Sequence, residues 1–145
     1  MSGPAELLAS RSLFDQYVAR RTHRLSTFHF SSLLAWCDFF DFSFEHIDGN
    51  LCVFAHDPSG AFLYLPPLGE KLTLTTVHAC LARMSHSSRG VARIENVGEE
   101  MCSLFSADRF TIKKKADEYI YRKADIVALT GGAYKSQRHD INHLL

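Results

Sequence analysis

The fold is decided by residues 42–65, FSFEHIDGNLCVFAHDPSGAFLYL, where short apolar runs alternate with turn-forming residues. The runs are Phe42 to Ile47, Leu51 to Ala55 and Ala61 to Leu65. They are rich in Phe, Val, Ile and Tyr, which pack well on the pleated surface of a sheet. The composition and the length of the runs predict three β-strands.

The segments between these runs indicate how the strands are connected. Asp48-Gly49-Asn50 suits a tight hairpin, and Asp57-Pro58-Ser59-Gly60 suits a slightly longer one. Short hairpins join antiparallel neighbours, so the three strands are expected to form a meander. Pro66-Pro67 follows and should end the third strand, because proline has no N–H for the ladder.

Helical patterns flank the predicted meander. After a loosely held start at Met1 to Ala9, Ser12 is expected to cap a helix, and a second short helix follows. A third helix, capped by Thr73, should end in the Ser85 to Gly90 loop. The apolar faces of the three helices are Leu13, Phe14, Tyr17 and Val18; then Phe30, Leu33, Leu34 and Trp36; then Leu74, Val77, Leu81 and Met84.

After Gly90 the chain alternates between strand-like and helix-like patterns of apolar residues. Strands are predicted at Val91 to Glu95, Phe110 to Lys113 and Glu118 to Arg122, a short helix at Glu99 to Phe105, and helical pieces at Ala124 to Leu129 and Tyr134 to Leu144. The order predicts an α/β (α+β) fold, in which helices flank a mixed, mostly antiparallel sheet. A chain of 145 residues with 46% hydrophobic content suits one domain, residues 1–145.

Composition narrows the class of protein. The four cysteines (Cys37, Cys52, Cys80 and Cys102) are far apart in apolar surroundings, and no signal peptide is evident. No apolar run reaches the roughly 18 to 20 residues of a membrane span. We therefore expect a soluble, cytoplasmic protein with reduced thiols. The net charge of zero gives no indication of a DNA partner.

Charge is nevertheless distributed unevenly. Residues 1–108 hold eight Lys and Arg against twelve Asp and Glu, whereas residues 109–145 hold eight against four. The basic residues near the C-terminus could attract a phosphate-bearing ligand, although a solvated basic face explains them equally well.

The most informative segment is the last one, Asp117 to Leu145, with the turn Thr130-Gly131-Gly132-Ala133-Tyr134-Lys135-Ser136. Glycines let the backbone approach a phosphate, and the N-terminus of a helix offers free N–H groups. The spacing matches neither a P-loop nor a dinucleotide-binding loop. On spacing alone, a structural hinge between two helices is favoured over a phosphate site.

Other candidate groups carry weaker signals. His139 and His143 lie four apart on the last predicted helix, but no third metal ligand is indicated, so we predict no metal site. Glu99, Glu100, Asp117 and Glu118 could include a general base, although helix-start and surface roles are favoured. Tyr119 and Tyr121 share one face of a predicted strand and are expected to be half-buried in the sheet. No catalytic residue can be assigned.

Three stretches together resemble the uncharacterised bacterial family that shares the C-terminal domain of phosphatidylglycerol lysyltransferase. They are Ser26 to Phe40; Asp48 to Leu51 with Leu65 to Gly69; and Asp117 to Tyr121 with Leu129, Gly131, Tyr134, Arg138, Ile141 and Asn142. The resemblance covers nearly the whole chain. It implies a GNAT-like fold, which such proteins carry as two tandem halves. This chain resembles the first half, either as a separate product or as a truncated one.

The resemblance also implies a function. Its relatives transfer an acyl or aminoacyl group, so acyl-CoA or aminoacyl-tRNA is the implied donor, and a second GNAT-like half or a homodimer is the implied partner. The ligand-binding candidates carried over are Tyr121, Gly131, Tyr134, Lys135, Arg138 and Asn142. Gln137 to Leu144 departs from the family pattern by one basic residue and one amide. The alternatives left open are a non-catalytic structural or interaction half, and tRNA binding through Lys113 to Lys123.

Overall fold

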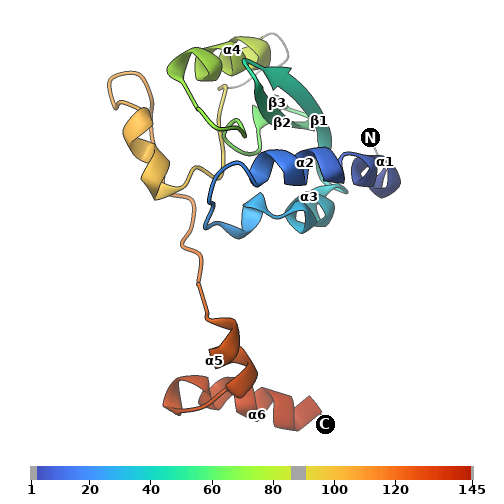
Figure 1. The fold of residues 1–145 in the computed structure, drawn as a ribbon, viewed down its shortest axis with the longest axis vertical. Helices are drawn as coiled ribbons and strands as arrows, with labels where there is room; N and C mark the ends of the chain where they lie inside the picture. The colour runs from blue at the N-terminus through green and yellow to red at the C-terminus, as the bar shows by residue number, and fades with distance from the viewer. Residues whose placement is uncertain (1–2, 86–90, 145) are drawn as a thin grey trace. The chain divides into compact units, whose positions relative to one another are not determined.

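The structure, a computed structural model, describes residues 3–85 and 91–144 and divides into two compact units. Unit 1 is Met1–Lys115 and unit 2 is Ala116–Leu145. Unit 1 contains α1 (Pro4–Ala9), α2 (Arg11–Val18), η1 (Ser26–Phe28), α3 (Phe30–Trp36), β1 (Asp41–Ile47), β2 (Asn50–Asp57), β3 (Gly60–Leu63), α4 (Leu74–Ser85) and η2 (Glu99–Leu104). Unit 2 contains α5 (Lys123–Ala128), η3 (Gly132–Tyr134) and α6 (Lys135–Leu144) (Figure 1).

The three strands of unit 1 form the predicted antiparallel meander in the order β1-β2-β3. The first hairpin pairs Ile47 with Asn50, and the second pairs Asp57 with Gly60. Asp48 and Gly49, between β1 and β2, have φ angles of 50° and 77°. Positive φ at both central residues is what a two-residue turn needs to match the twist of its strands. The turn residues therefore specify the pairing, as the sequence predicts.

Helices cover both faces of this sheet. Every residue of β2 from Asn50 to Ala55 is buried, although side chains alternate between the two faces of a strand. Helix α4 contacts β1 and β3, α2 contacts β2, and Figure 1 shows α4 on one side of the sheet with α2 and α3 on the other. Cys52 of β2 meets Cys80 of α4 with 3.5 Å between their Sγ atoms. The fold of the described residues is thus mixed α/β, as expected.

The N-terminal helices differ in detail from the prediction. The expected loose start contains α1, whose first position is Pro4 and whose Leu7 is buried in the core. Helix α2 begins at Arg11, so Ser12 lies inside the helix and the prediction of Ser12 as the cap is wrong. Ser10 takes that place because α1 ends there and α2 follows without a loop. The short helix α3 is confirmed.

Helix α4 begins as predicted. The Thr76 backbone N–H donates to Thr73 Oγ1 at 3.2 Å, and Val77 and Met84 are fully buried. Of the loop expected at Ser85 to Gly90, Ser85 belongs to α4, and the other residues lie outside the described ranges.

The strand predicted at Val91 to Glu95 is reduced to a single parallel bridge between Leu63 and Ile94. Leu63 N–H donates to Arg93 O at 3.1 Å, and Glu95 N–H donates to Leu63 O at 2.9 Å. The next acceptor along β3, Tyr64 O, is taken by the Asn96 side chain at 2.7 Å. Pairing stops there because Asn96 has a φ of 53°, which turns the chain away from the extended direction.

The strands predicted at Phe110 to Lys113 and Glu118 to Arg122 are wrong: both segments are irregular and exposed. The Phe110 ring packs edge-on against the Phe105 ring, with 5.2 Å between the ring centroids, so Phe110 contributes to side-chain packing rather than to a strand. Tyr119 and Tyr121 do share a side, since their rings stack at 6.5 Å, but both are largely exposed rather than half-buried. High β-propensity does not form a strand without a neighbour to pair with.

The two helical pieces of unit 2 are confirmed as α5 and α6. Leu129 ends α5 in the left-handed conformation, with φ 47° and ψ 33°, and Gly131 follows with a φ of 82°. None of the helices in the described ranges is long and apolar enough to cross a membrane.

Candidate functional site

All six residues predicted to bind a ligand lie in unit 2. Tyr121 precedes α5, Gly131 is in the turn after it, and Tyr134 belongs to η3. The remaining three, Lys135, Arg138 and Asn142, are on α6. The spacing of these three places them along one side of that helix, because residues three and four apart are neighbours on a helix surface.

Arg138 has a defined structural role. Its Nη1 donates to the carbonyl oxygens of Leu129 and Gly131, the latter at 2.9 Å. Leu129 is the C-cap of α5, so the guanidinium satisfies a carbonyl that the end of the helix leaves without a partner. The structure therefore brings Gly131 and Arg138 together.

The remaining predicted residues of unit 2 form no enclosed group. Lys135 and Asn142 are exposed, Tyr134 is half-buried, and Tyr121 is 55% exposed. His139 and His143 are in contact on α6, with their ring centroids 4.4 Å apart. No cluster of three or more potential metal ligands occurs among the described residues. Lys135 and Asn142 thus lie on an open surface of α6.

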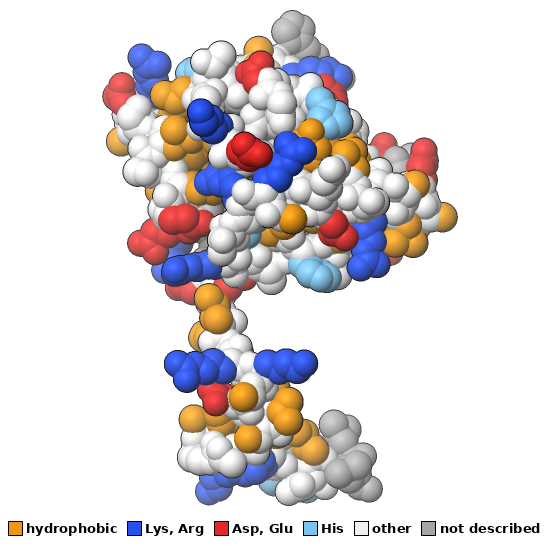
Figure 2. Space-filling model, in the orientation of Figure 1, with side chains coloured by type: hydrophobic (Ala, Val, Ile, Leu, Met, Phe, Trp, Pro, Cys, Tyr) orange, Lys and Arg blue, Asp and Glu red, His pale blue; other side chains and the backbone are white. Residues whose placement is uncertain are grey.

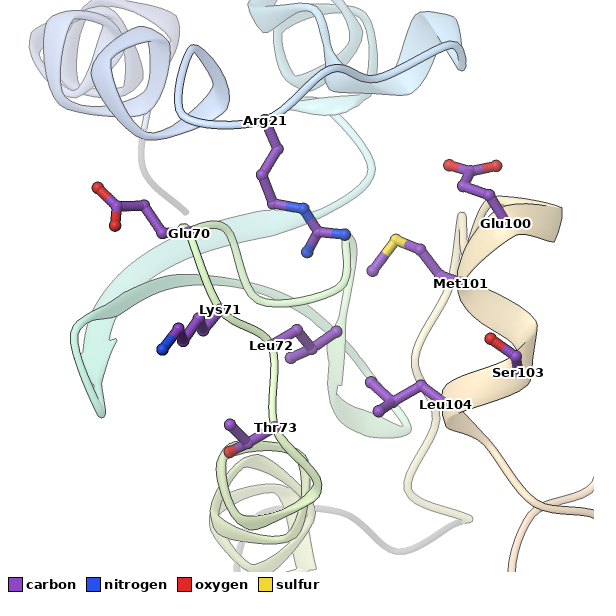
Figure 3. Close-up of a pocket in the computed structure, with 9 residues that line it drawn as sticks. All are labelled: Arg21, Glu70, Lys71, Leu72, Thr73, Glu100, Met101, Ser103 and Leu104. Atoms are coloured by element: carbon purple, nitrogen blue, oxygen red, sulfur yellow. The ribbon is translucent and has the colours of Figure 1, made fainter.

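A cavity of about 410 Å³ lies in unit 1 (Figure 3). It is formed where the segment after α2, the loop before α4 and η2 meet. Its lining residues are Arg21, Glu70, Lys71, Leu72, Thr73, Glu100, Met101, Ser103 and Leu104. Figure 3 shows the Arg21 guanidinium directed into the centre of the cavity, together with the side chains of Leu72, Met101 and Leu104.

A smaller hollow of about 270 Å³ shares Glu70 and Lys71 with this cavity. Its other lining residues are Arg20, Asp48, Gly49 and Asn50. Asn50 is 3% exposed and donates through Nδ2 to Asp48 O at 3.1 Å. Leu51 and Leu68 exchange two backbone hydrogen bonds of 2.8 Å, which hold the chain after Pro66-Pro67 against the start of β2. This pairing holds the segment that leads to Glu70 and Lys71, the two residues that line both hollows.

Hydrogen bonds also fix the helix next to these hollows. Thr76 Oγ1 donates to Asp48 Oδ2 at 3.1 Å, which ties α4 to the turn between β1 and β2. Thr76 is 1% exposed, so the bond is shielded on the helix side.

His23 feels the charges of Arg21 and Glu100, two residues that line the cavity. Burial lowers its pKa, the Arg21 charge lowers it further, and the Glu100 charge acts in the opposite direction. The ring stacks on Phe28 with 3.9 Å between centroids. Its Nε2 is buried and has no hydrogen-bond partner in the described structure. The ring therefore serves packing beside the cavity.

Sequence reasoning did not identify the cavity. Its residues come from three segments separated by tens of positions, and none of them forms a recognisable motif. Arg21 lies in the basic stretch Arg20 to Arg24, and nothing in that stretch distinguishes it from its neighbours.

Comparison with protein-family models matches residues 19–144 to the family described as Phosphatidylglycerol lysyltransferase, C-terminal. The matched range includes the whole sheet, both hollows of unit 1, and the six predicted residues of unit 2. No match was found among curated proteins or among solved structures. The family match covers most of the chain and agrees with the resemblance in the sequence. The chain therefore belongs to the phosphatidylglycerol lysyltransferase C-terminal domain family.

Proposed function

We propose that this chain is a GNAT-like domain, related to acyl- and aminoacyltransferases, that binds a phosphate-bearing acyl donor. Membership of the phosphatidylglycerol lysyltransferase C-terminal family carries the proposal, because a lysyltransferase, the enzyme in the family's description, transfers an aminoacyl group. In this proposal residues 1–145 are one domain, equivalent to the N-terminal half of a tandem pair. The donor is acyl-CoA or aminoacyl-tRNA, and the site of action is the cytoplasm.

The donor would bind along unit 2. Lys135, Arg138 and Asn142 supply an ammonium, a guanidinium and an amide on one side of α6. Arg138 is held by the Leu129 and Gly131 carbonyls, so its remaining N–H groups are oriented before a ligand arrives. A phosphate accepts hydrogen bonds from donors of this kind, and charge assistance makes such bonds strong. Tyr121 and Tyr134 add aromatic surface for a base.

A binding assay with two donors tests this proposal. Acetyl-CoA and a mixed aminoacyl-tRNA preparation are titrated separately into the protein, and thermal stability and fluorescence anisotropy are recorded. Lys135→Gln is expected to weaken binding of the true donor about tenfold, the loss of one charge-assisted contact. Asp140→Asn changes charge on the same helix without removing a donor group, so it should not weaken binding. No response to either donor would eliminate the proposal.

Arg138 requires a different comparison because it also holds the turn. Arg138→Ala removes the contacts to Leu129 and Gly131 together with any ligand contact. The circular dichroism of Arg138→Ala must therefore be measured beside its affinity. Affinity lost with the helical signal unchanged indicates a ligand contact.

A non-catalytic interaction half is the second candidate function. Unit 2 does not cover several of its own apolar side chains: Tyr119, Ile120, Ile126, Val127 and Ile141 are between 43% and 84% exposed. Figure 2 shows hydrophobic side chains at the surface of this unit. Such surface suits a protein partner, either a second GNAT-like half or another copy of the chain. Light scattering distinguishes the two functions, since a monomer that responds to a donor contradicts this one.

Binding of tRNA alone is favoured only by the exposed basic segment Lys113 to Lys123. It predicts an affinity that falls steeply as salt is added, because each phosphate contact releases counterions. Affinity that does not depend on salt would exclude it.

A further inference from the structure

Arg21 occupies an unusual position for a charged side chain. It is half-buried, and its guanidinium projects into the cavity of unit 1 (Figure 3). None of the described residues, 3–85 and 91–144, forms a hydrogen bond or an ion pair with this guanidinium. A guanidinium has several N–H donors and can bind a carboxylate or a phosphate through two of them. Arg21 is therefore placed to bind an anionic group at the centre of the cavity.

Three apolar side chains of the lining face this guanidinium. Leu72, Met101 and Leu104 point toward it in Figure 3, and Met101 is only 7% exposed. The cavity thus places a single positive charge beside a small hydrophobic surface. That combination suits a ligand with one anionic end and one apolar end.

The acidic residues at the rim do not neutralise Arg21. The carboxylate of Glu100 folds over Gly98, in the space that a Cβ at position 98 would need. Figure 3 shows the side chains of Glu70 and Lys71 directed away from the centre of the cavity. Arg21 is therefore the charged group of the lining that a ligand in the centre would meet.

The lining also argues against other ligand classes. It contains no aromatic side chain on which a nucleobase could stack. No group of metal ligands was found in the described part of the chain. Inorganic phosphate would use Arg21 but would leave the apolar walls exposed to water. A volume of about 410 Å³ suits a small molecule.

We propose that this cavity is a binding site for a small amphipathic carboxylate, whose anionic group pairs with Arg21 and whose hydrocarbon part contacts Leu72, Met101 and Leu104. A planar carboxylate accepts two parallel hydrogen bonds from a guanidinium, which orients the ligand. The site lies in unit 1 and uses none of the six residues assigned to donor binding. It therefore stands or fails separately from the proposed function.

Methionine methyl NMR of the whole chain provides the test. The chain has three methionines, and two of them make an internal comparison: Met101 lines the cavity, whereas Met84, a residue of α4, is fully buried. Hexanoate is expected to shift the Met101 methyl signal with saturation in the millimolar range and to leave Met84 unchanged. Acetate lacks the apolar part and hexylammonium reverses the charge, so both should bind at least about tenfold more weakly.

Two variants separate direct pairing from general electrostatics. Arg21→Gln should weaken hexanoate binding about tenfold, the value of one charge-assisted contact. Lys71→Gln removes the same charge from the same lining, but from a side chain that points away, and should retain the affinity of the parent within about twofold. The Met84 signal reports whether each variant is folded.

Three results would overturn the proposal. The first is equal hexanoate affinity in Arg21→Gln and the parent. The second is equal binding of hexylammonium and hexanoate. The third is a Met101 signal that hexanoate does not move.

Discussion

Thr76→Val is expected to loosen α4 from the turn between β1 and β2. Thr76 Oγ1 donates to Asp48 Oδ2 at 3.1 Å and lies 3.1 Å from Thr73 Oγ1, the capping hydroxyl. Valine has nearly the same shape as threonine but no hydroxyl. The substitution therefore removes the hydrogen bond while keeping the β-branched packing of a residue that is 1% exposed.

The magnitude follows from the environment of the two partners. A hydrogen bond to a charged group contributes about 1.5–3 kcal/mol to stability. Asp48 is exposed, so its carboxylate regains water when the hydroxyl is lost, and the lower end of that range applies. The buried methyl group of valine recovers a part of the loss. We expect the free energy of unfolding to fall by about 1–1.5 kcal/mol.

Urea denaturation followed by tryptophan fluorescence measures this change. Trp36 is the one tryptophan of the chain and lies in α3, so its signal reports on unit 1. Thr75→Val is the matched control: Thr75 is exposed on the same helix, and its substitution should change stability by less than about 0.5 kcal/mol.

A double-mutant cycle with Asp48→Asn identifies the bond itself. Asparagine tolerates the φ of 50° at position 48, so the turn should survive this change. The two substitutions should show a coupling energy of at least about 0.5 kcal/mol, because they remove one shared contact. Equal effects of Thr76→Val and Thr75→Val, or no coupling to Asp48→Asn, would refute the reasoning.

Three further predictions concern unit 1. Gly69→Ala should lower the free energy of unfolding by about 1–3 kcal/mol, because the new Cβ would overlap the side chain of the buried Asn50. Gly3→Ala is the control in the same urea experiment, because a Cβ at position 3 meets no atom. Burial acts to raise the pKa of Glu95, but Lys115 and Arg93 outweigh it and hold that pKa below the usual 4.5. The folded state then binds fewer protons than the unfolded state, so this contribution to stability is present above pH 4.5 and is lost as the pH falls through the lowered pKa. When the free energy of unfolding is measured against pH, Glu95→Gln should lose less stability in acid than the parent. An equal loss in the two proteins would contradict this prediction. Oxidation by diamide should form a disulfide between Cys52 and Cys80, whose Sγ atoms are 3.5 Å apart. The disulfide should raise the free energy of unfolding by about 3–4 kcal/mol, the value for a loop of this length. Absence of the linked peptides in mass spectrometry, or an equal gain in stability of Cys80→Ala on oxidation, would contradict this prediction.

The predictions made from the sequence are correct where the interactions join residues that are close in the sequence. The hairpin turn at Asp48-Gly49 depends on φ angles of two adjacent residues, and the Thr73 cap on a bond to a residue three positions away. Both are local, so residue identity alone indicates them. The same holds for the two helices of unit 2 and the hinge at Gly131.

The errors concern pairing between distant segments. Glu118 to Arg122 has the alternation of a strand, yet a strand exists only where a neighbour accepts its hydrogen bonds. Ile94 finds one such neighbour in Leu63; the positive φ of Asn96 then ends the pairing, and the Asn96 side chain bonds to Tyr64 O. These partners lie about 30 residues away in the sequence, beyond the reach of local propensity.

The candidate sites divide in the same way. The sequence predicted Arg138 as a ligand contact, and only the structure gave it a second role at the Leu129 and Gly131 carbonyls. The cavity around Arg21 was not predicted, because its walls come from separate segments that the sheet brings together.

The sequence by itself determined the meander, the helix at Leu74 to Ser85 and the family, since turn chemistry, capping and a shared pattern of residues are properties of the chain order. Tertiary structure alone decided which extended segments became strands and which charged side chain entered a cavity. The physical reason is that hydrogen-bond pairing and desolvation depend on neighbours in space, and folding selects those neighbours from all parts of the chain.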